Sequence, residues 1–356
     1  MLGFFSFPLS SQPQHLSRHR SLNFYTILKA VIVLSLISIY LLVSYRLSPV
    51  NAPDEPMRLL VPFFIVDNGC LPLGSDPAIV NTTWGTSYGF SAYGSSLLAV
   101  PFMLVAKLIH DTPFCLLFAA RFSVVITSGL NLVLCMKLAD AFKMSRSAGL
   151  TVVLMVGLLP QYVFLSSYFN SDILGIAATA LCVLQLKNAH DSRWDNKRSV
   201  YLGLALGVAA LSYYYAYGIF IVAIFVYVCD CVFGYVQNNR SLAYRIVGIP
   251  FLIIVSALVV CGWFFVRNIV LYNGDIFGMS TSSSFAELHA AEGFVPSTKT
   301  TPARLGFSPL GMLVGELFGM NWTEYTSKSA LCYLGAMQYG VADVFYNIYI
   351  FFFVLA

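Results

Sequence analysis

The stretch NAPDEPMRLLVPFFIVDNGCLPLGSD, residues 51–76, follows the first long apolar run of the chain and contains its first two acidic residues, Asp54 and Glu55. Behind these carboxylates, apolar residues recur at helical spacing: Met57, Leu59, Leu60, Phe63 and Phe64. This periodicity predicts a short amphipathic helix that lies on a membrane surface. We therefore expect two carboxylates at the membrane face, beside a spanning helix and within reach of a lipid-linked substrate.

The composition points to a polytopic membrane protein. Of the 356 residues, 58% are hydrophobic and only 10% are charged, and the mean hydropathy is +0.77. Several bilayer-spanning helices need so much apolar surface, whereas a soluble domain does not. The net charge of +4 comes from short clusters, which disfavours a nucleic-acid partner. The eight cysteines show neither a CxxC pair nor a Cys/His spacing typical of zinc sites.

Basic clusters predict how the chain is oriented in the membrane. Residues 1–27 are polar and basic, so we expect a cytoplasmic N-terminal tail and a first spanning helix at 28–46 that runs outward. The basic clusters at 137–146, 187–198 and 238–245 are also expected in the cytoplasm. Between them lie apolar runs at 148–167, 172–186, 199–213, 216–235 and 246–266. This orientation places Asp54 and Glu55 outside.

One apolar run, at 91–109, conflicts with this orientation if it crosses the membrane. We therefore expect it to lie in the outer interface, within a first outer loop at 47–116, and the second span to follow at 117–137. Residues 268–340 are expected to form an outer loop region. A last transmembrane helix is expected at 341–356, where the absence of a closing polar tail suggests a truncated chain. The predicted fold is all-α, with about eight spanning helices and interfacial helices in the first loop.

Other polar residues gather at the outer ends of predicted spans. Asn170 and Asp172 begin one span, while Arg267 and Asn268 end another. Each has a simpler interpretation, since an interfacial arginine often only snorkels to the surface. Tyr217 belongs to a tyrosine cluster that suits an interfacial aromatic belt or a sugar-binding surface. No predicted span carries a charged residue near its middle, which disfavours a transporter.

Five motifs in this order resemble the C-type (GT-C) membrane glycosyltransferases, the superfamily of protein O-mannosyltransferases and lipid A aminoarabinose transferases. They are PDE at 53–55, Asn68-Gly69 with Leu71-Pro72, Ala120-Arg121, Asn170-Ser171-Asp172 and WFFVRNIVLYNGD at 263–275. The resemblance covers roughly residues 28–280. Within the superfamily, the chain resembles predicted bacterial membrane proteins of unassigned function. It implies a GT-C-like transmembrane core at 28–267.

The resemblance also implies roles for individual residues. The first-loop aspartate, here Asp54, is the general base or orients the acceptor, with Glu55 secondary, and the donor is a polyprenyl-phosphate sugar. Relatives often have histidine where Arg58 stands, and many have a donor-binding lysine near Tyr215-Ala216-Tyr217-Gly218. The expected substrate-binding residues are Arg58, Lys107, Arg121, Asn170, Asp172, Tyr217, Arg267 and Asn268. Arg267, Lys107 or Arg121 would replace the missing lysine.

The chemistry follows from the position of the groups. A carboxylate can take the proton of an acceptor hydroxyl that attacks the anomeric carbon, while a guanidinium stabilises the phosphate leaving group. No organic cofactor is needed, and Asp54 and Asp172 are the expected ligands of a divalent cation if one takes part.

We therefore predict a glycosyltransferase of a bacterial plasma membrane. Its site faces outside, and its acceptor is a glycan, lipid or protein. The alternatives are a transporter or flippase-like binding protein for an amphipathic lipid, and a non-catalytic structural protein. A disulfide between Cys70 and Cys332 is a further hypothesis, because both lie in predicted outer loops.

Overall fold

The described part of the chain is mostly helical. The computed structural model describes residues 14–236, 241–317, 320–335 and 338–355. In these residues the strands form two short antiparallel hairpins: β1 (Glu316–Leu317) with β2 (Met320–Asn321), and β3 (Tyr333–Leu334) with β4 (Tyr339–Gly340). The predicted all-α class is therefore confirmed.

Five helices in the described residues are long and apolar enough to cross a membrane. They belong to α1 (Gln14–Arg46), α4 (Pro113–Ala141), α7 (Asp172–Asp191), α9 (Gly218–Val232) and α10 (Ile249–Leu271). The short 3₁₀ helix η3 (Tyr214–Tyr217) precedes α9, and the short π-helix η4 (Tyr244–Gly248) precedes α10. The five long helices indicate an integral membrane protein that crosses the bilayer several times. The count of about eight spans stays a prediction. Helix α1 also begins earlier than expected, within the predicted N-terminal tail.

The predicted span at 148–167 is not one helix. It divides into α5 (Arg146–Gly157) and α6 (Pro160–Leu165). Pro160 causes the break, because proline has no amide hydrogen and its ring disfavours a helical conformation in the residue before it. Hydropathy alone does not reveal such a division.

Three further apolar helices are shorter than the five candidate spans. Helix α3 (Gly94–Ile109) has 16 residues, or about 24 Å at the rise of an α-helix, which is less than the hydrocarbon core of a bilayer. This length agrees with the interfacial position expected for 91–109, which stays a prediction. Helix α8 (Asn196–Ser212) has 17 residues and α14 (Asp343–Leu355) has 13, so spans at these two places also stay predictions.

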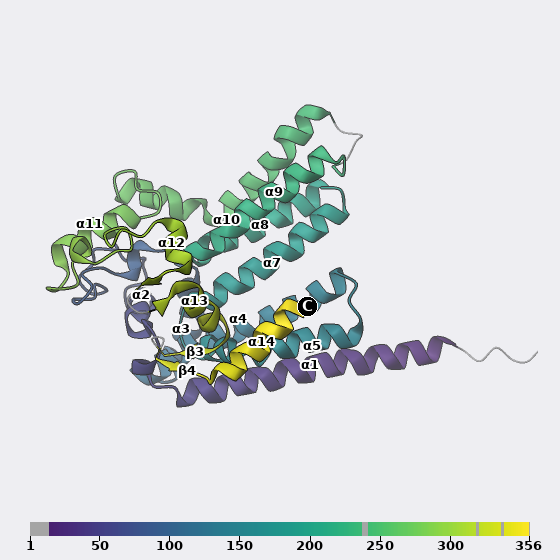
Figure 1. Cartoon of the computed structure of the whole chain (residues 1–356), viewed down its shortest axis with the longest axis horizontal. Coiled ribbons are helices and arrows are strands. Elements are labelled where there is room, and N and C mark those ends of the chain that lie inside the picture. Colours follow the sequence, from purple (N-terminus) through teal and green to yellow (C-terminus); the bar gives the residue numbers. More distant parts are fainter. Residues whose placement is uncertain (1–13, 237–240, 318–319, 336–337, 356) are drawn as a thin grey trace, which may run out of the picture.

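The long helices form two groups that lie side by side (Figure 1). In the first, α1, α4 and α5 enclose a core that includes Leu36, Tyr40, Leu132 and Val153. In the second, α7 to α10 surround buried residues such as Cys182, Leu202 and Ile249. Helices α4 and α7 pack against each other and connect the two groups.

Two glycines bring α8 close to α10. A Cβ atom on Gly203 would lie 2.4 Å from the Ile253 carbonyl oxygen, and one on Gly207 would lie 2.7 Å from that of Ala257. Small residues four apart allow such close helix packing within a membrane. The pair therefore fixes α8 against α10, and with it the position of η3, which follows α8 directly.

The remaining elements gather at one end of the two helical groups, where α1 ends and α7 begins (Figure 1). They are η1 (Pro49–Asn51), α2 (Glu55–Asn68), η2 (Tyr88–Phe90), α11 (Met279–His289), η5 (Pro296–Thr298), α12 (Pro309–Val314) and α13 (Trp322–Cys332). Cys70 and Cys332 are both free thiols, the first exposed and the second buried. The hypothesis of a disulfide between them is wrong for this structure.

Candidate functional site

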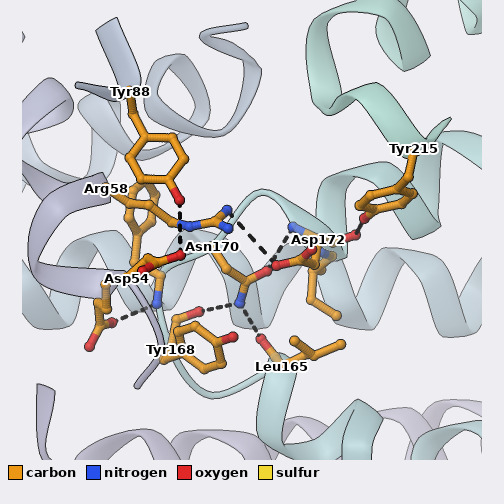
Figure 2. Close-up of polar contacts among 11 residues, drawn as sticks. Asp54, Arg58, Tyr88, Leu165, Tyr168, Asn170, Asp172 and Tyr215 are labelled. Atoms are coloured by element: carbon orange, nitrogen blue, oxygen red, sulfur yellow. Dashed lines mark hydrogen bonds and ion pairs between the residues drawn. The ribbon is translucent and has the colours of Figure 1, made fainter. Parts of the chain in front are cut away.

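Asp54 directly precedes α2 and has an unusual backbone. Its φ of 56° and ψ of 4° lie in the left-handed region, which few residues other than glycine adopt. The carboxylate does not cap α2, although capping is the simplest role for an aspartate there. Its Oδ2 instead accepts a hydrogen bond of 3.0 Å from the Tyr88 hydroxyl (Figure 2). The side chain is therefore turned toward the segment between α2 and α3 that contains Tyr88.

Glu55, the next residue, points the opposite way. Its two carboxylate oxygens accept bonds of 2.8 and 2.5 Å from Nε and Nη2 of Arg121, and Oε1 also accepts one of 2.6 Å from the amide of Phe169. Nη1 of Arg121 donates to the carbonyls of Ser44 and Leu47. Both side chains are buried, with exposed fractions of 0% and 3%.

These contacts give Glu55 and Arg121 a positioning role. The pair joins the end of α1, the start of α2, helix α4 and the segment before α7. Neither group has the exposure that contact with a substrate requires, in contrast to the catalytic and donor-binding roles expected from the sequence. A buried ion pair with two parallel hydrogen bonds holds both side chains in one position, because breaking it leaves an unpaired charge in an apolar environment.

Arg58 lies one turn along α2 from Asp54, and is buried between two tyrosine rings. Its guanidinium carbon is 4.8 Å from the ring centroid of Tyr88 and 5.5 Å from that of Tyr213. Nη1 is 3.9 Å from Oδ2 of Asp172, too far for a hydrogen bond. In the described part of the chain, Nε and Nη1 are buried without a hydrogen-bond partner. Arg58 thus has the Asp172 carboxylate as a nearby counter-ion, while two of its N–H groups are left without an acceptor.

Asn170 organises the start of α7, and Asp172 lies beside Arg58 as a result (Figure 2). The Asn170 side-chain oxygen accepts bonds from the amides of Asp172 and Ile173, and its nitrogen donates to the carbonyls of Leu165 and Tyr168. Asn170 is 1% exposed, so it shapes the turn and does not reach a substrate. The Asp172 carboxylate is left to face Arg58.

Burial raises the pKa of the Tyr88 phenol well above its usual value, Arg58 lowers it, and Asp54 raises it again. The net shift keeps Tyr88 protonated over the whole physiological pH range. It therefore acts as a hydrogen-bond donor to Asp54 and fixes one of the two carboxylate oxygens.

A pocket of about 450 Å³ opens beside Asp54. Its walls come from the start of α2, the loop before α3, η3, α11 and η5. They include Asp54, Met57, Trp84, Thr86, Tyr88, Ser91, Tyr214, Ser282, Ser283 and Lys299. Apart from Asp54, and from Tyr214 in the tyrosine cluster around Tyr217, none of these residues was predicted as a site residue from the sequence. The dense run of aromatic, serine and glycine residues at 84–94 could have revealed Trp84, Thr86, Tyr88 and Ser91.

The other predicted site residues, Arg58 and Asp172 included, lie outside the walls of this pocket. Lys107 pairs with Asp67 at 2.5 Å on an exposed surface. Nη2 of Arg267 donates to the Pro72 carbonyl at 2.6 Å. Asn268 is buried and donates to the Ile276 carbonyl, while the Tyr217 hydroxyl donates to the Ala210 carbonyl. The Lys107 pair joins α3 to α2, the Tyr217 bond holds η3 on α8, and the bonds of Arg267 and Asn268 hold the segments around Pro72 and Ile276 on the end of α10.

Asp54 and Asp172 are the residues expected to hold a divalent cation. Among the described residues, no group of three or more His, Cys, Asp or Glu residues could hold a metal ion. Asp172 faces a guanidinium, which would repel a cation placed on that carboxylate. Asp54 and Asp172 as metal ligands stay a prediction, and we derive no chemical step through a metal.

Comparison with known proteins adds no family: no protein-family model, curated protein or solved structure matches this chain. The GT-C resemblance therefore rests on the ordered sequence motifs alone and stays a prediction.

Proposed function

We propose that this protein is an integral membrane glycosyltransferase of GT-C type, with about eight spans and a site that faces outside a bacterial plasma membrane. It transfers a sugar from a polyprenyl-phosphate donor to an extracytoplasmic acceptor. The observation that carries the proposal is the pair formed by Asp54 and Arg58. A pocket-lining carboxylate and a buried guanidinium with unused N–H groups lie one helical turn apart.

Each group has a defined task in the reaction. The acceptor oxygen attacks the anomeric carbon, and its proton passes to the Asp54 oxygen that Tyr88 leaves free. The bond between the anomeric carbon and the phosphate oxygen breaks, and its electron pair stays on the phosphate. Arg58 stabilises the negative charge that develops there. The prenyl chain remains in the bilayer, so no nucleotide-binding site is required.

One observation favours the second candidate, a transporter or flippase-like binding protein for an amphipathic lipid. An apolar groove of about 510 Å³ lies between α8, α9 and α10, and its walls include Leu206, Ala223 and Ile253. A hydrocarbon chain would fit such a groove. It contains no group that could activate a hydroxyl, however, so it accounts for lipid binding and not for the site at Asp54.

The test is transfer of label in membranes that contain the protein. They are incubated with radiolabelled polyprenyl-phosphate sugars, and acid-stable products are counted. Asp54→Asn should insert normally and lose on the order of 10²-fold in rate, because asparagine cannot take the proton. The matched control is Asp76→Asn, since Asp76 lies in the same outer loop and only accepts a bond from the Ala78 amide. Transfer by Asp54→Asn at the wild-type rate would refute the proposal.

A further inference from the structure

The pocket beside Asp54 is built by two segments that are fixed to each other. The Thr86 and Ser282 hydroxyls lie 2.7 Å apart, and the Ala291 amide donates to the Thr83 carbonyl at 3.1 Å. Gly85 has a φ of +61°, and a Cβ atom on it would lie 2.2 Å from the Ala290 nitrogen. Only glycine permits this approach. The loop before α3 and the segment around α11 thus form one preformed surface.

The lining of the pocket suits a carbohydrate. The lining contains the hydroxyl groups of Thr86, Ser282 and Ser283 and the rings of Trp84 and Tyr214, beside apolar side chains that include Met57, Phe90 and Met279. Serine and threonine can donate and accept hydrogen bonds, as sugar hydroxyls require, and an aromatic face packs against the C–H face of a pyranose ring. Trp84 keeps 41% of its surface exposed. Lys299 lies over the ring and Phe294 forms a T-shaped contact with it, so a sugar would contact the part of the indole that these two leave free.

Other acceptor classes fit this lining less well. A lipid acceptor needs a continuous apolar wall, but hydroxyl groups interrupt the wall here. An extended peptide usually binds by adding a strand to a sheet edge. The only strand-like pairing in the pocket's own described segments is the isolated bridge between Asn81 and Thr86. The volume of about 450 Å³ is in the range of small-molecule sites.

The charged residues of the pocket indicate which charge a bound sugar should carry. Its charged lining residues in the described chain are Asp54, at the start of α2, and Lys299, which follows η5. The Lys299 ammonium lies 4.7 Å from the centroid of the Trp84 ring, and it forms no ion pair in the described residues. A lysine held above the aromatic platform would attract an acidic group on a sugar that packs there.

We propose that this pocket binds the acceptor, and that the acceptor is an oligosaccharide with an acidic substituent. A sugar ring packs on Trp84, its carboxylate or phosphate contacts Lys299, and the reacting hydroxyl reaches Asp54. The assignment of the saccharide as an acceptor, whose hydroxyl receives the sugar, rests on the proposed function. The binding step itself does not depend on catalysis and can be measured separately.

The experiment measures equilibrium binding to the purified full-length protein. The probes are a tetrasaccharide of alternating glucuronate and N-acetylglucosamine, the neutral tetramer of N-acetylglucosamine, and a peptide rich in serine and threonine. We expect the acidic saccharide to bind about fivefold more tightly than the neutral one at low salt, with the difference shrinking as salt is added. Lys299→Gln should abolish the difference, and Trp84→Ala should weaken both saccharides.

Lys197→Gln is the matched control, because Lys197 also lies over an aromatic ring, that of Tyr201, but belongs to a predicted cytoplasmic cluster. It should leave saccharide binding unchanged. Equal affinity for both saccharides, binding of the peptide alone, or no binding of any probe would overturn the inference. Acidic-saccharide binding in a protein that transfers no label would support the inference and refute the glycosyltransferase. Transfer without any preference for the acidic saccharide would refute the inference alone.

Discussion

Glu55→Gln removes one charge from the most buried ion pair of the site and leaves the shape of the side chain almost unchanged. In the wild type, the Glu55 carboxylate accepts two hydrogen bonds from Arg121 and one from the Phe169 amide. In the variant, the glutamine NH₂ group must face the guanidinium. Arg121 stays charged, 3% exposed and without a counter-ion.

We expect this change to lower the free energy of unfolding by about 3–5 kcal/mol, because removing one partner of a buried pair leaves an uncompensated charge. Natural domains have a stability of about 5–15 kcal/mol, so the loss is a large share of the total. The assay is reversible unfolding in detergent micelles, followed by circular dichroism. The control is Asp140→Asn, whose ion pair with Lys29 is largely exposed and should contribute about 0.2–1 kcal/mol.

A double substitution separates the cost of the unpaired charge from the cost of the lost hydrogen bonds. Glu55→Gln with Arg121→Met removes both charges and should recover part of the lost stability, because no unpaired charge remains buried. The Ser44 and Leu47 carbonyls still lose the donor that Arg121 supplies. A Glu55→Gln protein within about 1 kcal/mol of the wild type would refute the positioning role. A fully stable Glu55→Gln protein that loses transfer as completely as Asp54→Asn would make Glu55 a catalytic residue.

Two further predictions concern the donor and the topology. Arg267→Ala should weaken binding of a polyprenyl-phosphate sugar by about tenfold relative to Arg267→Lys. The reason is that Nη1 of Arg267 is buried without a partner in the described residues, and lysine retains the charge. An unchanged affinity in the alanine variant would leave Arg267 as an anchor of the Pro72 carbonyl. If α3 lies in the outer interface, cysteines introduced by Ser91→Cys and Asp111→Cys should both react with an impermeant reagent from outside. As a control, Lys143→Cys should react only from inside. Reaction of Asp111→Cys from inside alone would show that α3 crosses the membrane.

The helical framework was predictable because it depends on local patterns. The apolar periodicity after Glu55 predicted a helix, and α2 covers residues Glu55–Asn68. The charge clusters marked the ends of several long helices correctly. The break before Pro160 was missed, because the residues on both sides are apolar and hydropathy does not register a lost amide hydrogen.

The sequence pointed to Asp54, Arg58 and Asp172, which lie near one another, but not to their contacts or to most of the pocket wall. The sequence marked both Glu55 and Arg121 as polar residues beside spans, yet 66 positions separate them, and no local pattern shows that they bind each other. The pocket wall on α11 was expected to belong to an outer loop region at 268–340, and the Ser/Thr-rich start of α11 has weak helix propensity. Tertiary packing against the loop around Thr86 decides its structure.

The adjacent carboxylates Asp54 and Glu55 connect the fold with the proposed chemistry. A base gains most of its rate from exact placement relative to the reacting hydroxyl, but a residue in an exposed loop is mobile unless its neighbours are fixed. Here the left-handed backbone at Asp54 turns the two side chains apart. Glu55 is held by Arg121 in the core, and Asp54 is thereby presented to the pocket. A strained backbone persists only where the surroundings enforce it, so the buried pair and the exposed carboxylate are parts of one arrangement.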